Sequence, residues 1–555
     1  MQEKLISQFF KLLEAYDVRD VVCSPGSRNA ALLMAVDGND SFRAHVVTDE
    51  RSAGFIALGM AVASRRPVAL VCTSGSALLN YAPAIAEAYY QGVPLVAVSA
   101  DRPFEWIDQD DSQTIRQPGA LSNIVKCEYD LTAKYGDDED YLWFANRIVN
   151  EGLQRCLAPK AGPVHFNIHL DGNVAEEVYR AENVRKIERI TPAQRLSTQQ
   201  IKEFAERAKG RKIMFTAGFM EPDHKMQKAV SLLASLPNVC VMAETLSNLH
   251  LPPECTMVDT ALFAMSEEEK HSLKPDILIS TGGALVSRKL KEFLRENQPE
   301  EHWNLGVTEN IVDCFKALTT QIDCIPYTFL QTLGKLLACD KGGPDYRREW
   351  SEIREKTSVG TDDIGWSDLK ALASLFRRLP SDTNLVLSNG TCVRYGQILP
   401  LSKTHAIYSN RGVSGIEGCT STAVGIANVY GGITCLVTGD MSFGYDIAAL
   451  ASGMLTDNLR IVVLDNGGGE IFRFIKATKK LSIREKYLAT ENRVPIEDLA
   501  ETYGLRYFYA ASEKTLKKAL PYFFRKDCGP AILHLDTRNA GDNAAILEKY
   551  LTDRK

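Results

Sequence analysis

The stretch that decides the fold is TGDMSFGYDIAALASGMLTDNLRIVVLDNGGGEIF, residues 438–472. It contains a glycine turn, an alanine-rich helical pattern, a short loop and the apolar strand VVLD, which runs into an Asn and three glycines. Strands followed by Gly turns and helices are typical of βαβ units, whose helices cover both faces of a parallel sheet. The stretch therefore predicts a doubly wound α/β domain with a ligand site at the strand ends.

An earlier part of the chain has the same organisation. Gly75 and Asp101 are 26 residues apart in TSGSALLNYAPAIAEAYYQGVPLVAVSAD, as are Gly439 and Asp465 in the later block. A small-residue helix pattern precedes each block, SAGFIALGMAVAS in the first and CTSTAVGIANVYG in the second. Any two doubly wound domains share some of these features, but a duplication with another domain between the copies accounts for them better.

Strand and helix patterns alternate along the rest of the chain, and two polar stretches interrupt them, VRKIERITPAQRLSTQQ and CDKGGPDYRREW. At 555 residues the chain is long enough for three or four domains. We expect three doubly wound parallel-sheet α/β domains, at residues 1–184, 185–345 and 346–555, with the first and third duplicated and the middle one Rossmann-like.

Composition excludes several classes of protein. The net charge of −6 argues against nucleic-acid binding, because that function relies on clustered excess Lys and Arg. No stretch reaches about 18 apolar residues, so no membrane span is expected. The amphipathic start MQEKLISQFFKLLEAYDV is expected to form a surface helix and not a signal peptide, and the thirteen scattered Cys indicate free thiols in a reducing cytoplasm. We therefore expect a cytoplasmic protein.

The glycines after VVLD have two interpretations. A dinucleotide fingerprint counted from Gly467 would need a third glycine where Phe472 stands, so it fails. The other interpretation is a metal and diphosphate site. Asp440 and Asn466 end successive predicted parallel strands, and their oxygens, with a backbone carbonyl freed by the glycines, suit Mg²⁺. Taken alone, Asp440 could also be a helix N-cap and Asn466 a turn residue.

These residues resemble the cofactor motif of thiamine diphosphate enzymes, Gly-Asp-Gly followed some 25 residues later by Asn-Asn. Met441 and Asp465 depart from that motif without removing a presumed ligand. The resemblance implies thiamine diphosphate and Mg²⁺ (or Mn²⁺) as cofactors, with metal ligands Asp440, Asn466 and the Gly468 carbonyl. It also implies that the first domain binds the pyrimidine, that the third binds the diphosphate, and that different subunits of a homodimer or homotetramer supply them.

The family also requires a carboxylic acid beside N1′ of the aminopyrimidine, and Glu50, which follows the strand HVVT, is in the matching place. On its own the pair Asp49 and Glu50 would be interpreted as a helix N-terminus. Ile416 resembles the apolar residue that supports the bent cofactor. The remaining residues implied to contact the cofactor are Asn389, Met441 and Ser442.

Four local motifs narrow the resemblance to the menaquinone-pathway branch of the family: SPGSR (24–28), ADRP (100–103), QTIRQPG (113–119) and NRGVSGIEG (410–418). That branch decarboxylates 2-oxoglutarate and adds the resulting carbanion to isochorismate. Both substrates are dicarboxylates, which guanidinium groups bind with paired, charge-assisted hydrogen bonds. The substrate contacts implied by the match are Ser27, Arg28, Arg102, Gln113, Arg288, Lys289, Arg394, Arg411, Ile471 and Phe472.

Other interpretations remain open. Within the family, the chain could be an acetohydroxyacid synthase or a 2-oxoacid decarboxylase; outside it, a non-catalytic nucleotide-binding or regulatory protein. The middle domain shows no extended dinucleotide motif, so no flavin is expected. His165 and His169 alternate on a strand without an evident third ligand, which favours structural roles. Thr490, Glu491 and Asn492 stand where the branch has Thr-Pro-His, so this loop departs from the pattern of the branch.

Overall fold

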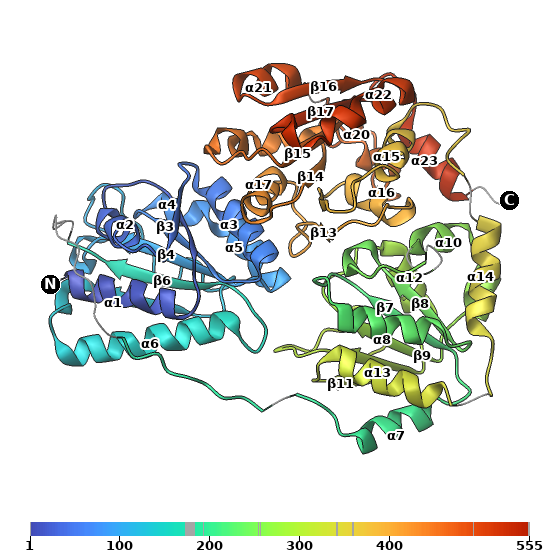
Figure 1. Cartoon of the computed structure of the whole chain (residues 1–555), viewed down its shortest axis with the longest axis horizontal. Coiled ribbons are helices and arrows are strands. Elements are labelled where there is room, and N and C mark those ends of the chain that lie inside the picture. Colours follow the sequence, from blue (N-terminus) through green and yellow to red (C-terminus); the bar gives the residue numbers. More distant parts are fainter. Residues whose placement is uncertain are drawn as a thin grey trace.

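The computed structural model describes residues 2–171, 184–192, 194–252, 255, 257–339, 342–357, 360–491 and 493–552. Figure 1 shows three α/β units: the first in blue at the left, the second in green and yellow at the lower right, and the third in orange and red at the top. Each contains one sheet in which every strand pair is parallel.

The first sheet has six strands in the order β2-β1-β3-β4-β6-β5. Its strands are β1 (Asp20–Cys23), β2 (Arg43–Val46), β3 (Val68–Cys72), β4 (Leu95–Asp101), β5 (Glu128–Thr132) and β6 (Val164–His169). The helices around it are α1 (Gln2–Ala15), α2 (Ala30–Asp37), α3 (Glu50–Ser64), α4 (Ser76–Asn80), α5 (Ala82–Gln91) and α6 (Glu139–Leu157), with 3₁₀ turns at Phe104–Trp106 and Ala133–Tyr135.

The third sheet repeats this order as β13-β12-β14-β15-β17-β16. Its strands are β12 (Asn384–Leu387), β13 (Ala406–Tyr408), β14 (Thr434–Gly439), β15 (Leu459–Asp465), β16 (Arg506–Ala510) and β17 (Ala531–Asp536). Its helices are α15 (Asp368–Phe376), α16 (Cys392–Ile398), α17 (Cys419–Val429), α18 (Asp440–Tyr445), α19 (Ile471–Phe474), α20 (Arg484–Tyr487), α21 (Ile496–Thr502), α22 (Glu513–Phe523) and α23 (Asn543–Thr552), with 3₁₀ turns at Ile447–Ser452 and Lys526–Cys528. Strand for strand, the order matches that of the first sheet, as a duplication requires.

The middle sheet has five strands in the order β11-β10-β9-β7-β8. They are β7 (Ile213–Ala217), β8 (Val239–Ala243), β9 (Ile277–Thr281), β10 (Glu301–Leu305) and β11 (Thr320–Ile322). The helices are α7 (Thr198–Ala208), α8 (His224–Ala234), α10 (Val258–Ala264), α11 (Glu267–Ser272), α12 (Arg288–Glu296), α13 (Pro326–Leu337) and α14 (Tyr346–Thr357), with a 3₁₀ turn at Thr245–Ser247. Although α14 follows the predicted boundary at 345, its Tyr346 and Trp350 are buried in a cluster of middle-unit side chains.

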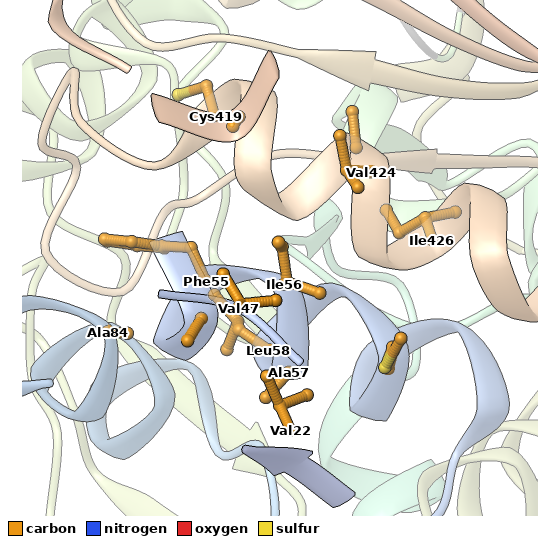
Figure 2. Close-up of a cluster of buried hydrophobic side chains, with 14 of the residues drawn as sticks. Val22, Val47, Phe55, Ile56, Ala57, Leu58, Ala84, Cys419, Val424 and Ile426 are labelled. Carbon is orange, nitrogen blue, oxygen red and sulfur yellow. The ribbon is translucent and has the colours of Figure 1, made fainter. Parts of the chain in front are cut away.

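The first and third units share a core. Helix α3 packs along α17 (Figure 1), and Figure 2 shows Ile56 of α3 on the side of α17, where Val424 and Ile426 lie. Leu58 lies on the other side of α3, toward Val22 of β1. All five side chains belong to one buried hydrophobic cluster that extends into both sheets. Burial of this apolar surface couples the two copies within the chain.

All thirteen cysteines are free thiols, as the sequence predicts. Within the part of the chain that the structure describes, no helix is long and apolar enough to cross a membrane.

Candidate active site

The predicted metal ligands meet at the carboxyl edge of the third sheet. Neighbouring strands β14 and β15 pair with Gly439 opposite Leu464, so Asp440 and Asn466 follow adjacent strand ends. Asp440 is the first residue of α18, and its Oδ1 accepts a hydrogen bond from the Met441 amide at 2.8 Å. The parallel register thus brings together two side chains that are 26 positions apart in sequence.

Gly468 has a conformation and surroundings that exclude a side chain. Its φ is +149°, and a Cβ there would lie 2.4 Å from the Thr490 carbonyl oxygen. Gly468 also forms an isolated antiparallel bridge with Glu491. In the loop that differs from the Thr-Pro-His of the branch, Thr490 and Glu491 therefore support the glycine turn. Asn492 of this loop lies outside the described residues.

Two oxygens at this edge are buried without a hydrogen-bond partner among the described residues: Oδ2 of Asp440 and Oδ1 of Asn466. Burial, with a smaller contribution from the charge of Asp465, raises the pKa of Asp440 to about 7. Buried oxygens with no donor are costly, and a cation is the partner that both could share. This arrangement fits a hard divalent ion bound through oxygen.

The loop at residues 410–418 closes over the same edge. The Asn389 side chain donates to the carbonyls of Asn410 and Gly415, both at 2.6 Å, and its oxygen accepts from Arg411 at 2.9 Å. Ser442 Oγ donates to the Ile416 carbonyl at 2.6 Å, which holds Ile416 beside α18. The Ile416 side chain remains 38% exposed, so it is available to contact a ligand.

Glu50 lies at the carboxyl edge of the first sheet, at the start of α3. The residue that caps this helix is Asp49, whose side chain accepts from the Ser52 amide at 2.8 Å. Glu50 Oε2 instead accepts from the Asn80 side chain at 3.2 Å. Because Asp49 performs the capping, helix capping does not account for Glu50.

Two of the predicted arginines, Arg28 and Arg102, are neighbours at the carboxyl edge of the first sheet. Burial, followed by the positive charge of Arg102, lowers the pKa of Arg28. Arg102 binds the Asp111 carboxylate at 3.0 Å and donates to the Ser112 carbonyl at 2.9 Å. Of the other residues predicted here, Ser27 and Gln113 are exposed.

A second group of arginines lies between the middle and third units. Burial, followed by the charge of Arg411, lowers the pKa of Arg394, and Asp259 and Arg288 are also close enough to influence it. Arg288 and Lys289 both pair with Glu292 on the exposed face of α12. Ile471 and Phe472 begin α19, directly after the glycine turn, and are half-buried.

Comparisons with known proteins identify the family. Residues 4–120 match the model described as thiamine pyrophosphate enzyme, N-terminal TPP binding domain. A 2-succinyl-5-enolpyruvyl-6-hydroxy-3-cyclohexene-1-carboxylate synthase of Porphyromonas gingivalis is 41% identical, over 99% of this chain and 97% of its own length. The chain belongs to this synthase family. A synthase of the same name from Bacteroides fragilis is 36% identical, over 99% of this chain and 98% of its own length.

The fold of the synthase also matches a solved structure. A chain provisionally described as a thiamin diphosphate-dependent enzyme of Mycobacterium smegmatis superposes with a TM-score of 0.71. The match covers 96% of this chain and 98% of that one at 20% identity, so it supports the three-unit fold alone. The predicted fold class, enzyme class and thiamine cofactor are thereby confirmed for this synthase.

Three supporting groups were not singled out from the sequence. Gln117 is fully buried and ties the 113–119 turn to Gly75, whose amide donates to it at 2.7 Å. Glu87 accepts from the amides of Gly412 and Val413, which joins α5 to the 410–418 loop. Glu244 ends the predicted strand VCVMAE and is fully buried, so a carboxylate directly after an apolar run was a usable signal.

The predicted structural histidines of the synthase have polar partners. His165 Nε2 lies 2.8 Å from Ser99 Oγ, and His169 contacts the Asp130 carboxylate.

In the middle unit, a Cβ on Gly218 would lie 2.2 Å from the Gly283 carbonyl, so the turns after β7 and β9 pack against each other.

Proposed function

We propose that this chain decarboxylates 2-oxoglutarate and transfers the succinyl unit to isochorismate. The family relationship over 99% of the chain carries the proposal, and the two unpartnered oxygens of Asp440 and Asn466 support the cofactor site it needs. Thiamine diphosphate, when bound, supplies the nucleophilic thiazolium carbon for decarboxylation and carbon–carbon bond formation.

Different residues of this chain would hold different parts of the cofactor. Asp440, Asn466 and the Gly468 carbonyl would hold Mg²⁺, and Ile416 of the 410–418 loop would contact the cofactor. Glu50 would give a hydrogen bond to N1′ of the aminopyrimidine and would hold the proton there. Asn389 acts through the loop, because its amide is already engaged with Asn410, Gly415 and Arg411.

A second copy of the chain completes each site. Val46 lies four positions before Glu50, and Leu79 precedes Asn80, which binds Glu50. Both are large apolar residues, yet they are 65% and 46% exposed. On the third unit, Val413 and Tyr445 are 51% and 52% exposed. Covering such apolar surface is what an oligomer interface does.

Four arginines from these two groups bind the carboxylates of the two substrates. Arg394 binds the distal carboxylate of 2-oxoglutarate, and Arg28, Arg102 and Arg411 bind isochorismate. Buried guanidinium groups that repel each other gain most from an added carboxylate, because it restores the charge balance lost on leaving water.

The test is single-turnover CO₂ release with and without isochorismate, with the product followed by mass. We expect Arg394→Ala to slow CO₂ release even without isochorismate. Arg28→Ala should release CO₂ but fail to form the ligated product, each lost charged hydrogen bond costing roughly 10- to 150-fold. A parent protein that prefers pyruvate to 2-oxoglutarate would replace this reaction with the acetohydroxyacid one.

A further inference from the structure

Asp368, the first residue of α15, is fully buried and binds the side chain of a proposed metal ligand. Its Oδ2 accepts a hydrogen bond from Asn466 Nδ2 at 2.8 Å. Its Oδ1 accepts from Thr537 Oγ1 at 2.5 Å. The carboxylate is therefore shared between the loop after β15 and the loop after β17.

We propose that Asp368 is a positioning residue that fixes the Asn466 amide with its oxygen toward the metal. The proposal rests on the ligand set of the proposed function. An Asn side chain can present either its oxygen or its NH₂ group, and only the oxygen binds a cation. A carboxylate accepts but does not donate, so Asp368 binds the NH₂ side of Asn466 and rejects the flipped amide.

The partner atoms on Asn466 agree with this role. Its Oδ1 is buried and has no hydrogen-bond partner among the described residues, while its Nδ2 is bound to Asp368. Oδ2 of Asp440, the other proposed ligand side chain, is likewise buried without a partner. The donor end of the amide is thus satisfied, and the acceptor end is left for a cation.

Asp368 is itself held rigidly. Its backbone amide donates to Asn543 Oδ1 at 2.9 Å. Thr537, which donates to the carboxylate, also gives its amide to the Asp465 carbonyl at 2.9 Å. Asp368 therefore cannot turn away from Asn466 without breaking contacts to two other segments. Groups behind a metal ligand typically change metal affinity by 10- to 100-fold when they are mutated.

Mn²⁺ binding at a fixed, saturating concentration of thiamine diphosphate, followed by the electron paramagnetic resonance of free Mn²⁺, tests the proposal. Asp368→Asn supplies an amide that can face Asn466 either way, so we expect the Kd for Mn²⁺ to rise on the order of 10-fold. Asn466→Asp places two carboxylates face to face and should also weaken binding. Adding Asp368→Asn to Asn466→Asp restores one donor and one acceptor, so here the same substitution should tighten binding.

The decisive observation is that Asp368→Asn raises the Kd for Mn²⁺ in the parent but lowers it in Asn466→Asp. A merely structural Asp368 would weaken Mn²⁺ binding, or leave it unchanged, in both proteins. Asp20→Asn is the matched control: Asp20 is also a buried, doubly bonded carboxylate, but it begins β1 in the first unit. Its Kd for Mn²⁺ should equal that of the parent. An unchanged Kd in Asp368→Asn, or no improvement in the double variant, overturns the proposal. A parent that binds no Mn²⁺ overturns the ligand set instead.

Discussion

Arg102 is held by a carboxylate of its own chain. Asp111 lies 3.0 Å from the guanidinium, in a segment where Asp108, Asp110 and Gln113 all have φ between 55° and 61°. Non-glycine residues seldom adopt this left-handed conformation, and three within six positions indicate a segment held in place by its contacts. If Arg102 binds isochorismate as proposed, Asp111 occupies the position that the substrate carboxylate would take.

We therefore expect Asp111→Asn to lower the KM for isochorismate by about 2- to 5-fold, because the substrate no longer competes with a half-exposed ion pair. Steady-state kinetics at saturating 2-oxoglutarate measure this. Asp108→Asn removes the pair with Arg116 in the same segment and should leave KM unchanged. A higher KM in Asp111→Asn would mean that Asp111 orients Arg102 for the substrate.

At the scale of elements, the contact between α3 and α17 depends on two glycines. A Cβ on Gly59 would lie 2.1 Å from the Thr422 carbonyl oxygen, and one on Gly425 would lie 2.0 Å from that of Ile56. Each glycine thus receives the backbone of the opposite helix. The two helices follow equivalent strands of the duplicated units, and each has a glycine against which the backbone of the other packs.

We expect Gly425→Ala to lower the free energy of unfolding by roughly 1–3 kcal/mol, because the added methyl group meets backbone that cannot move independently. Thermal and denaturant unfolding of the cofactor-free protein measure the loss. Gly431→Ala, just beyond α17, is the control, since a Cβ there has no atom within 4 Å. Equal stability of the two variants would show that the helices can separate without cost.

At the scale of the molecule, the proposed function makes the duplicated units contribute opposite halves of a site. The first carries Glu50 and the third carries Asp440, each at the carboxyl edge of its own sheet. Within one chain, α3 and α17 bind these units to each other through their shared core. If the site lies between copies, Glu50 of one subunit serves Asp440 of the other.

Co-expression of Glu50→Gln and Asp440→Ala chains with different tags tests this arrangement. In a mixed dimer one site carries both substitutions and the other carries neither, so about half of the parent activity should return. Each variant alone should be inactive or nearly so: Glu50→Gln loses the acid at N1′, and Asp440→Ala loses the charged metal ligand. Inactive mixed dimers would place both residues in a site formed by one chain.

The proposed ligand residues show best what could be predicted from the sequence. That Asp440 and Asn466 lie at one sheet edge was predictable, because strand–turn–helix periodicity places both there and parallel pairing needs no further information. Resemblance added Glu50 and the arginines. The strand patterns and the repeated block predicted the three sheets and their duplication, since both depend on local sequence.

Other features depend on packing between distant segments, which no local pattern encodes. Asp368 is 98 residues from the Asn466 that it binds. Which of Asp49 and Glu50 caps α3 depends on rotamers chosen by the fold, and Thr490 reaches Gly468 only after the third unit is assembled. The sequence by itself determined the elements and the chemistry at their ends. Only the tertiary structure decided which buried atoms remain without partners, because that requires every neighbour to be in place.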